Sequence, residues 1–288
     1  MLKKIIFTLL CVTTTSTYSF EVYQFLTWQY LKMPNGEMKY SKEISGYDDI
    51  LASIGMKKMD VIYAKRLLTN GEADPNKIKK IVEATKINPN TPICFDIEMG
   101  IASRPETNLP VILDALNLYH KFGGKAPIGV YGVLPQATPN QIISESKRNY
   151  YVTLNKKYEE IATKVDFLAP TLYFYSLKDM DIWKDKAAFN MQEAKKYAKK
   201  YDLKIYPFVS LSTWDIQDQN SKNQKFFITP ISEKNMTTAL SFLESQGANG
   251  VILWESTSSK HASDKMPAVF DMNRDSFKSV VKIMNNNK

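Results

Sequence analysis

Two carboxylates close an apolar run in the stretch Thr91–Gly100, which reads TPICFDIEMG. In a strand, side chains alternate between faces, so the apolar residues share one face while Asp96 and Glu98 share the other. The two acids then lie about 7 Å apart and repel, and partial burial disfavours their ionisation, so one of them is expected to have a raised pKa. Such a pair suits general acid catalysis of glycosidic cleavage, although acids at strand ends also cap helices or lie in solvated loops.

Aromatic side chains close four other strand candidates. Each alone is typical of core packing, but together with the acid pair they indicate a lining on which sugar rings could stack. They are Trp28, Tyr131, Tyr173 with Tyr175, and Trp254. Two long segments, 211–229 with Trp214 and Asp215, and 256–272, are interpreted as loops that could build a polymer groove.

Apolar runs of strand length alternate with segments of helical periodicity, which indicates a repeated βα fold. The expected strands are Glu21–Trp28, Met59–Ala64, Pro92–Glu98, Pro127–Gly132, Val165–Phe174, Leu203–Ser210 and Gly250–Glu255. The expected helices are Tyr47–Ser53, Pro75–Ala84, Leu109–Phe122, Gln141–Thr163, Ala187–Tyr201, Glu233–Gln246 and Phe270–Met284. Thr138-Pro139 and Ser232-Glu233 have the composition of helix starts.

This alternation places the chain in the α/β class. A doubly wound sheet is the other architecture with the same alternation, but its usual Gly-rich first turn is absent from Trp28–Gly36. We therefore predict a single (β/α) TIM-like barrel with seven strands. In such barrels the functional residues lie at the C-terminal ends of the strands and in the loops that follow.

The first residues are interpreted as an export signal. Lys3 and Lys4 precede a short apolar run, and a polar stretch of small residues reaches Ser19. We expect a signal peptide over residues 1–19, a barrel domain over 20–288, and a secreted or periplasmic protein. No later segment approaches a membrane span.

Few residues suit a metal or a disulfide. Cys11 falls in the expected signal, so Cys94 is the one cysteine of the mature chain, and His120 and His261 are far apart with no ligand spacing. We expect no metal and no cofactor. Loss of Lys3 and Lys4 lowers the formal net charge from +8 to +6. The basic excess fits an anionic polysaccharide or a simple composition bias, and no nucleic-acid motif is visible.

The order of the motifs resembles the hyaluronidase family, of which the chain looks like a compact, remote relative. Members of that family have a seven-stranded βα barrel with an Asp-x-Glu pair at a strand end. The matching blocks are FDIE (95–98), GVYGVLPQ (129–136), LAPTLYFY (168–175), IYPFVSLSTWD (205–215) and GANGVILWES (247–256).

The resemblance implies a role for each site residue. Glu98 would protonate the leaving oxygen, and Asp96 would orient the substrate's own acetamido group, whose carbonyl oxygen attacks the anomeric carbon. Tyr173 matches a tyrosine that contacts this group, and Trp254 a tryptophan at the floor of its pocket. The implied activity is glycosidic cleavage beside an N-acetylhexosamine in a polysaccharide.

The chain also departs from the family pattern. Ile97 stands where the family has tryptophan, and Arg104-Pro105 comes later than expected. A second family tyrosine has no match in Leu134–Pro139. Tyr131 is the nearest substitute for it, at a different position. Two alternatives stay open: a lysozyme-like muramidase, whose barrel also combines Asp-x-Glu with a Gly-x-Tyr strand, and a non-catalytic carbohydrate-binding barrel.

Overall fold

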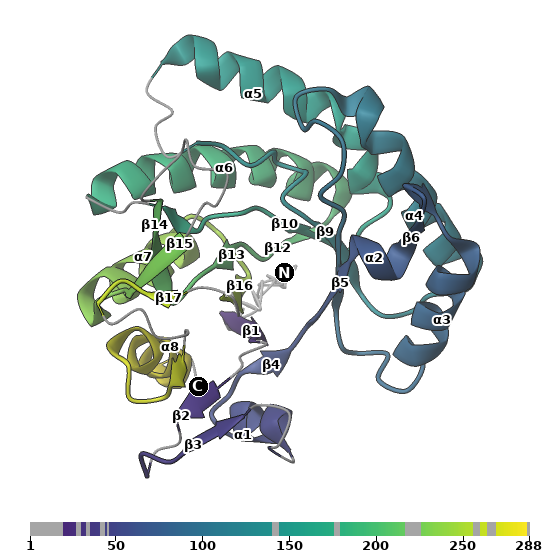
Figure 1. Ribbon diagram of the computed structural model, residues 1–288. Coiled ribbons are helices and arrows are strands. Elements are labelled where there is room, and N and C mark those ends of the chain that lie inside the picture. Colours follow the sequence, from purple (N-terminus) through teal and green to yellow (C-terminus); the bar gives the residue numbers. More distant parts are fainter. Residues whose placement is uncertain are drawn as a thin grey trace, which may run out of the picture.

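The computed structural model describes residues 20–286 except 27–29, 33–34, 41–43, 45, 140–143, 176–178, 217–225, 256–259 and 264–268. The expected signal, residues 1–19, lies outside this part of the chain. Parallel strands occupy the centre of the molecule and helices surround them (Figure 1). The central strands are β1 (Glu21–Phe25), β4 (Lys57–Lys58), β5 (Asp60–Tyr63), β8 (Ile93–Asp96), β9 (Ile128–Tyr131), β10 (Phe167–Ala169), β12 (Lys204–Ile205), β13 (Phe208–Val209) and β16 (Gly250–Trp254).

These strands join into a ring. One sheet has the order β13-β16-β1-β4 and the other the order β12-β10-β9-β8-β5. β4 and β5 are one strand interrupted at Met59, and β12 and β13 are one strand interrupted at Tyr206 and Pro207, so each pair links the two sheets. The linking bonds are Met59 N to Gln24 O (3.2 Å), Asp60 N to Pro92 O (3.0 Å), Tyr206 N to Leu168 O (2.9 Å) and Ile252 N to Pro207 O (2.8 Å). The ring therefore has the seven strand positions expected from the sequence.

The helices lie outside the ring, and most occupy the expected positions (Figure 1). They are α1 (Tyr47–Ser53), α2 (Ala64–Leu67), α3 (Pro75–Thr85), η2 (Pro105–Thr107), α4 (Leu109–Lys121), α5 (Glu145–Lys157), η3 (Glu159–Thr163), α6 (Met180–Tyr201), α7 (Glu233–Ser245) and α8 (Asp275–Asn286). None of those in the described part of the chain combines the length and apolar character needed to cross a membrane.

Three helix starts differ from expectation. Ser144 caps α5 by accepting a hydrogen bond from Lys147 N, so Thr138-Pro139 does not begin that helix. α6 starts at Met180, because Asp179 caps it, rather than at Ala187. The segment before α8 forms a short strand, because Val269–Asp271 pairs with Tyr30–Lys32. The Ser232 cap of α7 is as predicted.

Small sheets extend the barrel at its rim. β11 (Phe174–Tyr175), β14 (Ser212–Ile216), β15 (Phe226–Pro230) and β17 (Lys260–His261) form one sheet. The described ends of the segment 211–229 are thus paired antiparallel strands where a loop was expected. β2 (Tyr30–Lys32), β3 (Met38–Tyr40) and β18 (Val269–Asp271) form another, and β6 (Leu68–Thr69) pairs with β7 (Glu72–Ala73).

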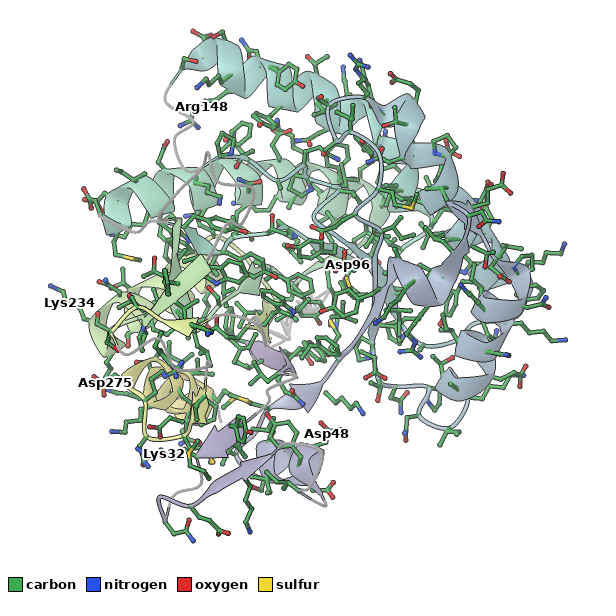
Figure 2. The ribbon with its side chains drawn as sticks, viewed as in Figure 1. Lys32, Asp48, Asp96, Arg148, Lys234 and Asp275 are labelled. Carbon is green, nitrogen blue, oxygen red and sulfur yellow. The ribbon has the colours of Figure 1, made fainter. Side chains whose placement is uncertain are left out.

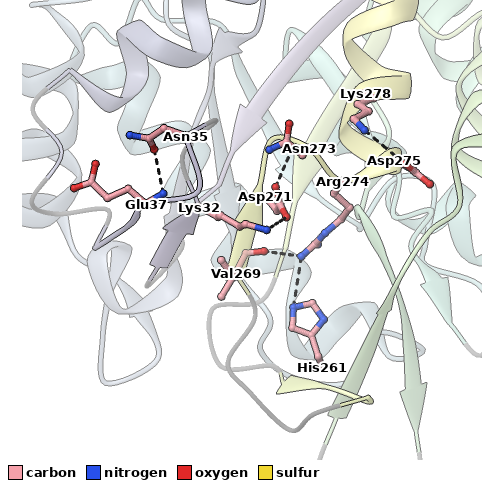
Figure 3. Close-up of polar contacts among 10 residues, drawn as sticks. All are labelled: Lys32, Asn35, Glu37, His261, Val269, Asp271, Asn273, Arg274, Asp275 and Lys278. Carbon is pink, nitrogen blue, oxygen red and sulfur yellow. Dashed lines mark hydrogen bonds and ion pairs between the residues drawn. The ribbon is translucent and has the colours of Figure 1, made fainter.

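Polar contacts attach the C-terminal segment to these outer sheets (Figure 3). Lys32 Nζ lies 3.2 Å from an Asp271 carboxylate oxygen. The Arg274 guanidinium donates to the carbonyl of Val269 and lies 3.5 Å from His261 Nε2. Burial lowers the pKa of Arg274, while the nearby Glu255 and Asp271 carboxylates oppose that shift. The start of α8 is thereby tied to β2, β17 and β18.

The interior of the ring is filled by side chains from alternate strand positions, as barrel geometry requires. Its buried apolar members are Tyr23, Met59, Val61, Cys94, Phe167, Ala169, Tyr173, Tyr206, Phe208 and Ile252. Gly129 makes room for one of them, Phe167, because a Cβ atom at position 129 would lie 2.3 Å from Phe167 Cε2. A larger residue at this position would have to displace the Phe167 ring.

This close approach predicts the effect of Gly129→Ala. The added methyl group overpacks the ring interior, so we expect the free energy of unfolding to fall by about 1–3 kcal/mol. Urea denaturation followed by circular dichroism measures the change. Phe167→Leu, which removes the obstructing ring, should cost less in the Gly129→Ala background than in the wild type. Additive effects of the two substitutions would contradict the proposed clash.

Candidate active site

The acid pair lies where β8 reaches the mouth of the barrel. Ile93, Phe95 and Ile97 belong to the core between strands and helices, so the apolar face points outward as predicted. Asp96 is 8% exposed, and Figure 2 labels it among the central strands. Glu98, two residues further along the chain, is exposed. The second acid, two residues beyond the end of β8, is thus outside the barrel interior.

Because of this difference in burial, the two carboxyl groups lie in different electrostatic environments. Burial, and secondarily the charge of Glu98, raises the pKa of Asp96 to about 7. Within the described part of the chain, no donor reaches Asp96 Oδ1. The sequence led us to expect one raised pKa in the pair, and the geometry assigns it to Asp96, the residue with the smaller exposed fraction.

A pocket of about 200 Å³ opens beside the pair. It is formed by the C-terminal ends of central strands together with β11 and β14, which is where a barrel normally places its site. The lining residues are Val61, Tyr63, Asp96, Glu98, Tyr131, Tyr173, Tyr175, Phe208, Trp214 and Trp254. Two carboxyl groups thus face a wall made mainly of aromatic rings.

Three of these rings pack against one another. The Tyr173 ring is parallel to Trp214 within 4° at a centroid distance of 6.1 Å, and Trp254 lies 5.4 Å from both. For a sugar ring to fit between two aromatic faces, the faces would have to be about 7–8 Å apart, twice the usual carbon–carbon contact distance. A sugar in this pocket would therefore lie on an outer face of the group and not between its members.

The tyrosines supply neutral hydroxyl groups. Burial, and secondarily the charge of Glu98, raises the pKa of Tyr175 to about 12. Burial also raises the pKa of Tyr131 and of Tyr173, with contributions from the neighbouring phenols and carboxylates. All three phenols keep their protons near neutral pH, so each can donate a hydrogen bond to a polar ligand.

Tyr63 is a pocket residue that sequence reasoning missed. Its hydroxyl oxygen accepts a hydrogen bond from Trp254 Nε1 at 3.2 Å, and burial raises its pKa. The contact fixes the indole of Trp254 against the end of β5. The pattern that singled out Tyr131 also applies to Tyr63, because both are aromatic residues at the end of an expected strand.

Most of the predicted site residues come together in the pocket. Asp96 and Glu98 lie with the predicted aromatic residues of β9, β11, β14 and β16. Asp215 lies in β14 opposite Phe227, and its side chain is outside the described part of the structure. Trp28 is also outside it. In the residues that the structure describes, no three His, Cys, Asp or Glu side chains gather as metal ligands would.

The raised pKa of Asp96 predicts a pH-dependent stability. The unfolded chain releases this proton near pKa 3.8 and the folded chain near 7, so the stability that the protonated form confers is lost as the pH rises through that window. Asparagine has no such proton. Relative to the wild type, Asp96→Asn should therefore gain stability from about pH 4 to about pH 7, by on the order of 4 kcal/mol at most, and nothing further above it.

Urea denaturation at several pH values measures this difference. Asp114→Asn, which changes an exposed carboxylate on α4, is the matched control and should show no comparable trend. A difference between Asp96→Asn and wild type that does not change with pH would show that Asp96 is not buried as a protonated acid.

Comparisons with known proteins show which solved structures share this fold. No family model and no curated protein matches it. Bee venom hyaluronidase is similar in structure, with a TM-score of 0.52 and 15% identity over 83% of this chain and 91% of that chain. The spore cortex-lytic enzyme SleL of Bacillus megaterium has a TM-score of 0.53 and 10% identity over 92% of this chain and 73% of its own. The similarity confirms the barrel and, at the level of fold, the resemblance to hyaluronidases.

Proposed function

We propose that the protein is a glycoside hydrolase that cleaves a polysaccharide beside an N-acetylhexosamine. The observation that carries this proposal is the pocket in which a buried acid, Asp96, and an exposed acid, Glu98, face a wall of aromatic rings. Aromatic faces suit the apolar faces of sugars, and the two acids can serve different chemical roles.

In the proposed first step, Glu98 gives its proton to the glycosidic oxygen and the bond from that oxygen to the anomeric carbon breaks. The carbonyl oxygen of the substrate's acetamido group attacks the same carbon, which yields a cyclic cation and a free alcohol. Asp96 must act as a carboxylate in this step, which requires a pH near or above its pKa of about 7 in the free protein. The carboxylate then accepts the acetamide N–H and offsets the positive charge. A water molecule then gives a proton to Glu98 and opens the ring with net retention of configuration.

The dimensions of the pocket support one sugar unit beside the acid pair. Its volume of about 200 Å³ suits a single N-acetylhexosamine ring. Hyaluronan is a candidate polymer because a hyaluronidase shares the fold and because the chain is basic. A cell-wall glycan is the alternative, since β9, with its Gly129-Val130-Tyr131 sequence, lies directly beside β8 as the muramidase reading requires.

We also propose export of the chain, on the basis of its basic and apolar first residues. Mass spectrometry of the protein from culture medium and periplasm tests this. Removal of about 19 residues supports export, and an intact N-terminus in the cytoplasmic fraction contradicts it.

Substitution of the acid pair tests the proposed roles. Glu98→Gln should lower kcat by about 10²–10⁴-fold, because it removes the proton donor, and Asp96→Asn should lower it by a comparable factor. Reducing-end release from hyaluronan, chondroitin, chitin and peptidoglycan fragments is the measurement. Glu106→Gln, an exposed acid on η2, is the control and should retain wild-type activity.

The same assays separate the alternatives. Release from peptidoglycan but not from glycosaminoglycans would favour the muramidase. Glycan binding without any product, and with affinity unchanged in Glu98→Gln, would favour a non-catalytic binding barrel. Full activity of both variants on a substrate that the wild type cleaves would refute the catalytic pair.

A further inference from the structure

A lysine is buried directly behind the wall of the pocket. Lys186 lies in α6 and is 2% exposed. Its ammonium nitrogen lies 5.3 Å from the centroid of the Tyr175 ring, within the range of a cation–π interaction. Tyr175 lines the pocket, and the charge of Glu98 acts on its hydroxyl. A positive charge thus contacts the ring that neighbours one of the two acids.

The start of α6 is held firmly against the segment that carries the pocket tyrosines. Trp183 Nε1 donates to the carbonyl of Leu172 at 3.0 Å, and the Trp183 ring packs on Phe174 at 5.1 Å. Lys186 follows Trp183 by three residues, so both side chains lie on the same face of the helix. This places the ammonium group over Tyr175, the next residue after Phe174.

A second set of contacts fixes the helix one turn further along. Asn190 Nδ2 donates to the carbonyl of Lys186 at 2.9 Å and to Thr138 Oγ1 at 2.6 Å. Thr138 belongs to the segment that follows β9, whose last residue is the pocket residue Tyr131. The backbone of Lys186 is therefore tied to the rim on both sides of the pocket.

An ammonium group in this position is costly. Burial lowers the pKa of Lys186 to about 8, which measures the penalty on its charged form. Its neighbours on the buried face of α6 include Trp183, Ala187 and Met191, so a methionine or leucine would fit the same surface without that penalty. An apolar side chain at this position would lack the contact between a positive charge and the Tyr175 ring.

We propose that Lys186 is a positioning residue, whose ammonium group holds the Tyr175 ring in place beside Glu98. The inference rests on the proposed glycosidase function, since Tyr175 would contact the bound sugar. Because the proposed effect passes through Tyr175, removing the charge should change activity only while that ring is present.

The substitution Lys186→Met tests this, because it keeps the length and most of the volume of the side chain and removes the charge. We expect kcat/KM to fall roughly 5- to 30-fold, the range of a desolvated cation–π contact. The melting temperature is measured in parallel, so that a loss of activity caused by a loss of stability can be recognised. Lys199→Met, at an exposed position of α6, is the matched control and should leave both quantities unchanged.

A double-mutant cycle with Tyr175→Leu identifies the path of the effect. In the Tyr175→Leu background, Lys186→Met should cause no further loss of kcat/KM. An equal loss in both backgrounds, wild-type activity of Lys186→Met, or a loss that follows a lowered melting temperature would each overturn the positioning role.

The failure of this inference can be told apart from the failure of the proposed function. A wild type that neither cleaves the four glycans nor binds N-acetylglucosamine oligosaccharides, followed by tryptophan fluorescence, overturns both. If the wild type binds without cleaving, the same cycle is measured on the dissociation constant, with the same expected fold-changes. An active wild type with an unaffected Lys186→Met variant overturns the inference alone.

Discussion

Burial of one carboxyl group at the rim of a closed ring of strands is the constraint on which the pocket depends. The strands at the seven positions of the ring run parallel and end at the same rim, and Asp96 lies at this rim with little contact with water. Ionisation at such a position costs free energy, so the pKa of the group rises to about 7. The ring must stay closed for this environment to exist, because an open sheet would expose its edge to water.

The aromatic wall maintains this environment. Large rings from β5, β9, β11, β14 and β16 exclude water from the carboxyl group, while their hydroxyl and indole groups can still bind a polar ligand. The rings are fixed by contacts behind them. Tyr63 accepts a hydrogen bond from Trp254, and α6 packs against the segment that carries Tyr173 and Tyr175. Pocket geometry thus depends on helix packing as much as on the strands.

The features that were predictable from the sequence are those with a local period. Alternation along 93–98 separates apolar from acidic side chains without any knowledge of the rest of the chain, and strand and helix lengths follow in the same way. Contacts between distant segments were beyond that reasoning. The pairing of β14 with β15, the position of Lys186 behind Tyr175, and the choice of Asp96 over Glu98 for the raised pKa all depend on tertiary burial.

The placement of both acids on one strand bears on the chemistry. Retaining glycosidases that use a protein nucleophile place two carboxyl groups on opposite sides of the scissile bond. Asp96 is the last residue of β8 and Glu98 follows it by two residues, so both acids reach the pocket from the end of the same strand. Two acids that reach a sugar from one side are poorly arranged for one to attack the anomeric carbon while the other protonates the leaving oxygen. For the glycosidase proposed above, this common origin of the two acids is the reason to propose the substrate's own acetamido group as the nucleophile.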